Sequence, residues 1–172
     1  MMKRDYKQGF TMLEALITLV IIGVLSLIAV PSLMHQIKDW RVKEDSLIVE
    51  QAIKEARSNA ITRSRTCLLD FSQAATHNGT NGGLVQVKQN DGTVISQFYL
   101  SDNVLYNNSA STISGDEIRF DFRGQPVDSS GATSGFTTST NQVTISYYSG
   151  STAIASKSIT VTPVTGYTII NN

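Results

Sequence analysis

Hydrophobic and polar positions divide the chain into four segments. Residues 1–9 are mostly polar, residues 10–34 are almost wholly apolar, and residues 35–65 repeat apolar residues every three, four or seven positions between charged ones. From residue 66 onward, short runs alternate between apolar and polar residues. Helices produce the first kind of repeat and strands the second. The pattern predicts an α+β protein in which a long N-terminal helix packs on a small antiparallel β domain over residues 66–172.

The apolar segment, residues 10–34, is long enough to cross a membrane. As a helix its 25 residues span roughly 37 Å, against ~30 Å for the hydrocarbon core. Apolar residues occur on every side of this helix, which is typical of a helix surrounded by lipid or buried in a bundle. Lys3, Arg4 and Lys7 precede it. Because basic residues stay on the cytoplasmic side, we expect a single-pass inner-membrane protein with a cytoplasmic N-terminus and a periplasmic C-terminal domain.

A secretory signal peptide and a plain membrane anchor fit this segment less well. A signal peptide needs small residues before its cleavage site, but the nearest candidate bond follows Leu27 and Ala29 and precedes Pro31 by one residue. Leu27 is too large for that pattern. Glu14 argues against a plain anchor, because a carboxylate costs up to ~2.5–3.5 kcal/mol at the middle of a membrane helix and needs a partner.

The residues around position 10 resemble the class III signal of type IV prepilins and pseudopilins. Lys7-Gln8-Gly9 ends a short basic leader, and Phe10-Thr11-Met12-Leu13-Glu14 opens the apolar segment. In that family a prepilin peptidase cuts after the Gly and methylates the new N-terminal Phe. The resemblance implies cleavage between Gly9 and Phe10 and N-methylation of Phe10. Removing the nine leader residues from 172 leaves a mature chain of 163.

Three further residues of the segment have expected roles in assembly. Cleavage creates an α-amino cation at Phe10, which Glu14 of a neighbouring subunit could neutralise and so set the register between subunits. Gly23 and Pro31 match typical positions of prepilin helices. Pro31 is expected to kink the helix. In pilin-like fibres these two positions permit local melting, although Gly and Pro are also common in membrane helices generally.

The rest of the chain is predicted to form the second half of the helix and six to eight strands. The buried face of the helix is expected to carry five apolar residues: Val42, Val49, Ile53, Ala56 and Ala60. Turns are predicted at Asn90–Gly92 and Ser149–Ser151, and polar loops at Thr76–Gly83, Asn107–Gly115 and Asp128–Asn141. The strands are predicted at Cys67–Phe71, Leu84–Lys88, Val94–Leu100, Ile118–Phe122, Val143–Tyr148 and Ile154–Val161.

Within the pilins, three segments resemble the GspH/FimT-type minor pilins and pseudopilins. They are Glu55–Ile61, Ile118–Pro126 and Ile159–Gly166. Major pilins often carry a C-terminal disulfide loop, which a chain with the single cysteine Cys67 cannot form. The sequence therefore favours a minor subunit.

Composition and motifs argue against catalysis and against several kinds of ligand. The 14 basic and 14 acidic residues balance, which excludes a protein that acts through a strong overall field. The chain has two histidines, His35 and His77, and no catalytic, zinc or phosphate-binding motif. We therefore expect no enzyme, no cofactor and no metal. Calcium is a weaker alternative at the four carboxylates that lack a regular loop spacing, Asp116, Glu117, Asp121 and Asp128.

Direct DNA binding is also not expected. Some members of the subgroup take up DNA through a C-terminal Gly-Arg-x-Arg, but the matching place reads Gly166-Tyr167-Thr168-Ile169. Only one base, Lys157, follows Gly124. Since phosphate contacts from Lys and Arg dominate DNA affinity, this C-terminal part has too few positive charges to bind DNA directly. The helix-end cluster Arg57, Arg63 and Arg65 is interpreted as a solvated helix terminus.

The sequence thus predicts a minor pilin that helps to initiate or cap a type IV pilus. The alternative is a minor pseudopilin of a type II secretion system, and a DNA-binding pilin is the third hypothesis. The resemblance implies four partners: the prepilin peptidase, other minor and major pilins or pseudopilins, the inner-membrane assembly platform, and membrane lipid. After leaving the inner membrane, the subunit is expected near the fibre tip.

Overall fold

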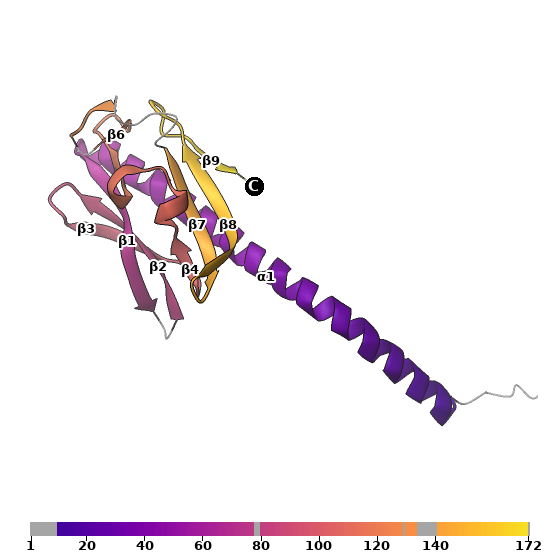
Figure 1. Ribbon diagram of the computed structural model, residues 1–172. Coiled ribbons are helices and arrows are strands. Elements are labelled where there is room, and N and C mark those ends of the chain that lie inside the picture. Colours follow the sequence, from indigo (N-terminus) through magenta and orange to yellow (C-terminus); the bar gives the residue numbers. More distant parts are fainter. Residues whose placement is uncertain (1–9, 78–79, 129, 134–140, 172) are drawn as a thin grey trace, which may run out of the picture. The chain divides into compact units, whose positions relative to one another are not determined.

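One α-helix and nine β-strands make up the described part of the chain (Figure 1). The computed structural model describes residues 10–77, 80–128, 130–133 and 141–171. The predicted α+β class is confirmed. The expectation of six to eight strands is too low, since the elements are α1 (Met12–Arg63), β1 (Cys67–His77), β2 (Thr80–Gln89), β3 (Val94–Tyr99), β4 (Val104–Tyr106), η1 (Asn108–Ala110), η2 (Ser114–Asp116), β5 (Glu117–Phe120), β6 (Pro126–Val127), β7 (Gln142–Ser149), β8 (Thr152–Val161) and β9 (Thr168–Asn171).

The chain divides between Ile37 and Lys38 into two compact units. The first contains the apolar part of α1, and the second contains the rest of α1 and all the strands.

The second half of α1 is buried along one face. The five apolar positions predicted for that face are all fully buried, as are Ala52 and Ser46, and Asp45 is nearly so. This confirms the amphipathic pattern. The helix ends at Arg63, because Ser64 adopts a left-handed φ of 50° and the Arg65 N–H donates to the Ala60 carbonyl at 3.1 Å.

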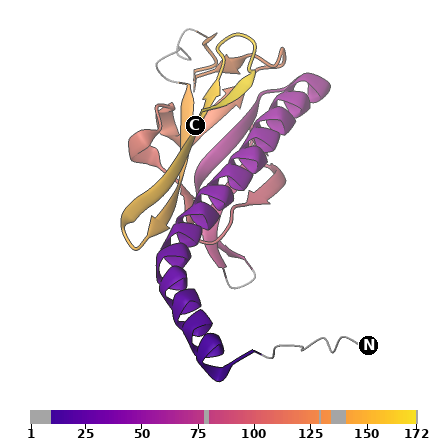
Figure 2. The same ribbon diagram turned by 90° about the vertical axis from the view of Figure 1, so that its right-hand side faces the viewer.

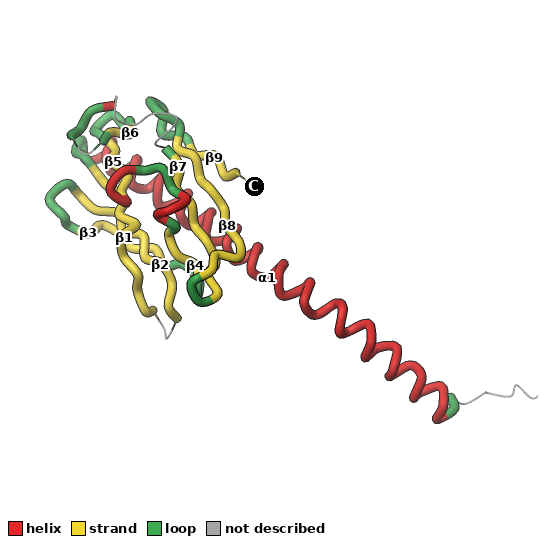
Figure 3. The backbone as a smooth tube through the Cα atoms, viewed as in Figure 1, coloured by secondary structure: helices red, strands yellow, loops and turns green. Residues whose placement is uncertain are grey.

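Two antiparallel sheets pack with this half of the helix around one hydrophobic core. The five-stranded sheet has the order β3-β2-β1-β5-β6, and the four-stranded sheet has the order β4-β7-β8-β9. Figures 2 and 3 show this second half of the helix running across both sheets. The core side chains alternate along the strands, as at Ile118 and Phe120 in β5 and Val143 and Ile145 in β7.

The observed strands differ from the predicted ones mainly in polar or short segments, where side chains give little signal of strand pairing. The loop predicted at Thr76–Gly83 is wrong at its described positions, since β1 extends to His77, β2 begins at Thr80, and the two strands pair from Gln73↔Leu84 to His77↔Thr80. Backbone hydrogen bonds need no apolar side chains, so a polar sequence hid this hairpin. The sequence pattern does not predict strands β4, β6 and β9, which have three, two and four residues. The predicted loop at 107–115 contains η1 and part of η2, whereas the loop at 128–141 lies largely outside the described residues.

Both predicted turns are confirmed. Gly92 has a φ of 87°, and its N–H donates to the Gln89 carbonyl at 2.9 Å. Gly150 has a φ of 63° between paired Ser149 and Thr152. Glycine adopts these left-handed conformations without the steric cost that other residues bear.

Candidate functional site

Thr11 caps the start of the apolar helix. Its Oγ1 lies 3.3 Å from the Glu14 amide nitrogen and accepts that N–H, and its carbonyl accepts the N–H groups of Glu14 and Ala15. Thr11 and Glu14 have the Thr-x-x-Glu spacing of a capping box. The sequence analysis missed this role, although the spacing is visible in the sequence. Phe10 lies before the cap, outside the helix, and is 74% exposed.

Glu14 occupies the first turn of α1. A carboxylate is stabilised there by the helix dipole, by ~0.3–1 kcal/mol at exposed positions. The residue is exposed, and it forms no salt bridge within the described residues. The helix terminus therefore offsets only part of the cost of placing this charge in an apolar segment.

The apolar part of α1 exposes large hydrophobic side chains on every side. Each described residue from Phe10 to Ile37 is exposed, and α1 is the one helix of the described chain that is long and apolar enough to cross a membrane. The hydroxyls of Thr18 and Ser26 donate to the carbonyls of Ala15 and Ile22, so neither polar group needs water. Such a surface is consistent with anchoring in a membrane.

Gly23 and Pro31 both lie inside α1. A Cβ built on Gly23 would meet nothing within 4 Å, so packing within the described chain does not require glycine there. The helix is continuous from Met12 to Arg63 through Pro31. Their roles in kinking and melting stay predictions. Gly9, on the leader side of the expected cut, lies outside the described residues.

Arg57 belongs to the first segment of the GspH/FimT-type resemblance and lies beside Gly124 of the second and Gly166 at the end of the third. Its Nε donates to the Gly124 carbonyl at 3.1 Å, and its guanidinium carbon lies 5.5 Å from the centre of the Tyr167 ring. Ile61 and Arg57 also touch Gly124, where an added Cβ would lie 2.7 Å from the Ile61 Cδ1. The helix, the β5–β6 turn and the β8–β9 loop therefore meet at one place.

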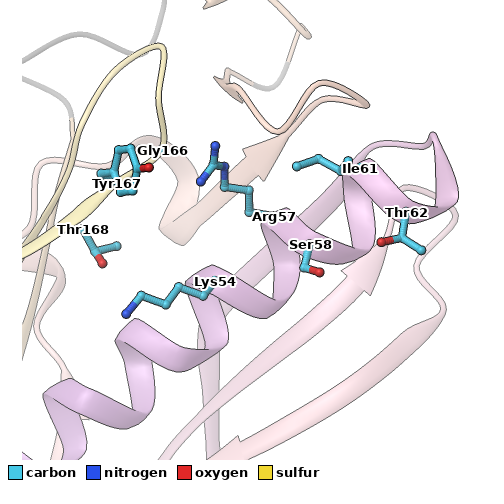
Figure 4. Close-up of a pocket in the computed structure, with 8 residues that line it drawn as sticks. All are labelled: Lys54, Arg57, Ser58, Ile61, Thr62, Gly166, Tyr167 and Thr168. Carbon is cyan, nitrogen blue, oxygen red and sulfur yellow. The ribbon is translucent and has the colours of Figure 1, made fainter.

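A cleft opens beside Arg57, between α1 and the β8–β9 loop (Figure 4). Its volume is about 400 Å³. Its lining combines two cations, hydroxyls and apolar groups: Lys54, Arg57, Ser58, Ile61, Thr62, Gly166, Tyr167 and Thr168.

Asp45 is a buried acid that the sequence analysis did not single out, although it lies between Val42 and Val49 on the buried face. It is 1% exposed, and its two carboxylate oxygens accept the N–H and the hydroxyl of Ser101, both at 3.0 Å. Burial raises the pKa of this carboxyl to about 6, against the opposing effect of the Ser101 hydrogen bonds. The pair ties α1 to the segment between β3 and β4.

The four acids considered for calcium take part mostly in local contacts. Asp121 accepts the N–H groups of Arg123 and Gln125, and Asp128 accepts those of Ser130 and Ala132. Glu117 pairs with Arg119 at 2.7 Å, and Asp116 accepts from Asn108. No cluster of three or more metal-ligating side chains occurs among the described residues.

The remaining candidates for chemistry are separated from one another. Cys67 is buried in the core, and burial raises the pKa of its thiol, which disfavours the reactive thiolate. His35 is exposed on the apolar half of α1, and the side chain of His77 lies outside the described residues.

Comparison with known proteins identifies the N-terminal segment. Residues 4–30 match the family model of the prokaryotic N-terminal methylation motif. No curated protein and no solved structure matches the chain.

The fold and this motif define a chain whose exposed apolar N-terminal helix carries a methylation motif and is consistent with membrane anchoring. The match supports the type IV prepilin and pseudopilin family, as the sequence predicts. It covers the N-terminal segment only and does not extend to the GspH/FimT subgroup.

Proposed function

We propose that the chain is a minor pilin, a structural subunit that helps to initiate or cap a type IV pilus. The observation that carries the proposal is the methylation motif at residues 4–30, placed directly on a helix whose apolar surface is fully exposed. In this proposal a prepilin peptidase cuts between Gly9 and Phe10 and methylates Phe10. The exposed position of Phe10 before the helix cap supports access to this bond.

The apolar half of α1 would hold the subunit in the inner membrane and then enter the fibre core. There, contacts with neighbouring helices replace contacts with lipid. Glu14 would pair with the α-amino group of Phe10 on a neighbouring subunit and so set the register. The helix dipole offsets only a small part of the free-energy cost of placing this carboxylate in an apolar segment. Glu14 also forms no salt bridge in the described chain. Both observations support a partner on another subunit.

The proposed partners follow from this cycle. They are the peptidase, other minor and major pilins, the inner-membrane assembly platform and membrane lipid. The N-terminus would be cytoplasmic and the β domain periplasmic, with the subunit ending near the fibre tip. The role is structural, and no catalytic activity is proposed.

A minor pseudopilin of a type II secretion system is the second candidate, because the same motif and helix support it. A deletion strain separates the two. Loss of surface fibres with normal protein secretion indicates a pilus subunit, whereas the reverse indicates a pseudopilin. A DNA-uptake pilin is not proposed, since Tyr167 and Ile169 stand where that motif carries arginines.

Intact mass and N-terminal sequencing of the protein from its own cells test the proposal. We expect a chain that starts at N-methyl-Phe10 in cells with an active peptidase. The variant Gly9→Val should keep Met1 and stay in the membrane, whereas Gly23→Val should be processed normally. Retention of the leader by the unaltered protein in peptidase-competent cells would contradict the proposal.

A further inference from the structure

The cleft beside Arg57 has a positive lining. Lys54 and Arg57 are its charged residues, and no carboxylate is among the described residues that line it. The hydroxyls of Ser58, Thr62 and Thr168 and the ring of Tyr167 complete its polar surface. In Figure 4 the side chains of Lys54, Arg57, Tyr167 and Thr168 extend into the space between the helix and the β8–β9 loop.

The position of Arg57 is set before any ligand arrives. Its Nε donates to the Gly124 carbonyl, and its guanidinium faces the Tyr167 ring. Gly166 makes this approach possible, because a Cβ there would lie 3.3 Å from the Arg57 Cδ and 3.1 Å from Phe120. The two Nη groups form no hydrogen bond within the described residues, and a guanidinium presents such groups in a fork that fits a carboxylate.

Lys54 can change partner at little cost. Its Nζ lies 2.9 Å from the Glu50 Oε1, but the Lys54 side chain is 66% exposed. Exposed pairs of this kind contribute ~0–1 kcal/mol. The same Glu50 oxygen also accepts the Thr168 hydroxyl at 2.8 Å. Glu50 therefore keeps a hydrogen bond when Lys54 moves to a second acid.

The rim of the cleft is apolar and exposed. Tyr167 is 67% exposed and Ile61 is 46% exposed. Phe122 and Val164, on the turn and the loop that flank the cleft, are also exposed. Arginine and tyrosine, which lie side by side here, are among the residue types enriched in protein-binding hot spots. Two cations are too few for a polyanion, because DNA-binding proteins commonly make 6–10 phosphate contacts.

We propose that this cleft is a docking site for an acidic segment of a neighbouring pilin-like subunit. An Asp or Glu side chain of that segment binds the Arg57 Nη groups and Lys54, and its apolar neighbours cover Tyr167 and Ile61. The charge of the lining supports this occupant. The proposal rests on the proposed function, because the binding partner is assumed to be an adjacent subunit of the same fibre.

Photocrosslinking in the producing cells tests the docking site. A photoreactive amino acid replaces Thr62 in the cleft of the full-length chain, and a matched control carries it at Ser151, an exposed residue of the β7–β8 turn. We expect the Thr62 position to crosslink to a second protein with a prepilin-type N-terminus, at a peptide that contains Asp or Glu.

Charge reversal then separates docking from folding. Lys54→Glu should lower the crosslink yield about tenfold, whereas Lys43→Glu, exposed on the same helix outside the cleft, should not. Changing the crosslinked acid of the partner to Lys should restore the yield with Lys54→Glu. Rescue of this kind cannot come from a general loss of stability.

Several results would overturn the proposal. They are a crosslink to nucleic acid or lipid, equal crosslinking at Thr62 and Ser151, no crosslink at Thr62, or a yield that Lys54→Glu leaves unchanged. The N-terminal mass of the same sample separates the two proposals. A chain that keeps its leader contradicts the proposed function, whereas a chain processed at Phe10 without the expected crosslink contradicts the docking site alone.

Discussion

Asp45 shows how a single residue can influence the stability of the β domain. Its carboxyl is buried between α1 and Ser101, where the ionised form is disfavoured despite two hydrogen bonds. Gly82 is a second such residue, because the backbone of β2 approaches the Leu100 carbonyl so closely that no side chain fits. Both residues contact the segment formed by Leu100 and Ser101.

Replacing Asp45 with Asn should remove a pH dependence of stability. The pKa of Asp45 is about 6 in the folded chain, above the ordinary aspartate value of 3.8. Between these two pH values the folded state binds more protons than the unfolded state. The free energy of unfolding therefore falls as pH rises, by on the order of 3 kcal/mol across the window for this almost fully buried group. Urea unfolding of the detergent-solubilised chain at pH 4 to 7 measures this.

Comparison of the two proteins at each pH isolates Asp45. Glu50 acts in the opposite direction, since hydrogen bonds from Lys54 and Thr168 hold its pKa below the usual value, but it is present in both chains and cancels. Parallel pH profiles for the unaltered chain and Asp45→Asn would show that Asp45 does not titrate in this window.

Gly82→Ala should destabilise the β domain. The new Cβ would lie 2.3 Å from the Leu100 carbonyl oxygen and 2.8 Å from that of Ser101, so the backbone has to move. Overpacking of this kind costs about 1–3 kcal/mol. Thr152→Ala, at an exposed strand position, should change stability by less than ~0.5 kcal/mol. Equal midpoints of thermal unfolding for the two variants would contradict the expectation.

At the scale of elements, α1 has two halves with opposite surfaces. The half from Phe10 to Ile37 exposes its apolar side chains, whereas the half from Lys38 onward buries them against the sheets. A helix that is apolar on all sides needs a lipid or protein environment, and one with a single apolar face needs only a core. One continuous helix can thus serve as both anchor and core element.

Ile53→Ala should destabilise the domain far more than Leu47→Ala. Ile53 is fully buried, so its truncation leaves a cavity and costs about 2–5 kcal/mol. Leu47 lies on the same helix but is exposed, and its loss should cost less than ~0.5 kcal/mol. The midpoints of urea unfolding of the two variants provide the comparison, provided that the dependence of the unfolding free energy on urea concentration is the same for both. Similar losses for the two variants would mean that this half of α1 does not pack as described.

At the scale of the whole molecule, the chain joins an exposed apolar helix with a methylation motif to a β domain of neutral to weakly acidic character. The motif at residues 4–30 supports processing and assembly with other pilins. In the proposed function, Glu14 has no charged partner while the subunit is in the membrane and pairs with the Phe10 α-amino group of a neighbouring subunit in the fibre.

Glu14→Ala should block assembly without blocking processing. The variant keeps Gly9 and Phe10 and the Thr11 cap, so the peptidase should still cut it, but the α-amino group of the neighbouring Phe10 loses its proposed partner. We expect at least a tenfold drop in the sheared-fibre fraction, on the order of 1.4 kcal/mol or more. Glu44→Ala, an exposed acid further along α1, is the matched control. Normal incorporation of Glu14→Ala would contradict the register role.

The sequence by itself determined the features that depend on local order and periodicity. The apolar run, the buried face from Val42 to Ala60, the glycine turns at Gly92 and Gly150 and the N-terminal signal could all be predicted, because each is a property of neighbouring residues. The cap at Thr11 and the buried position of Asp45 were also visible in the sequence and were missed.

Only the tertiary structure decided which distant segments meet. The polar hairpin of β1 and β2, the short strands β4, β6 and β9, and the close approach at Gly82 depend on backbone pairing, which leaves little signal in side-chain pattern. Arg57, which lines the cleft, is held by contacts with Gly124 and Tyr167, which are 67 and 110 positions away along the chain. Contacts at such separations arise from the packing of the whole domain, and no local pattern encodes them.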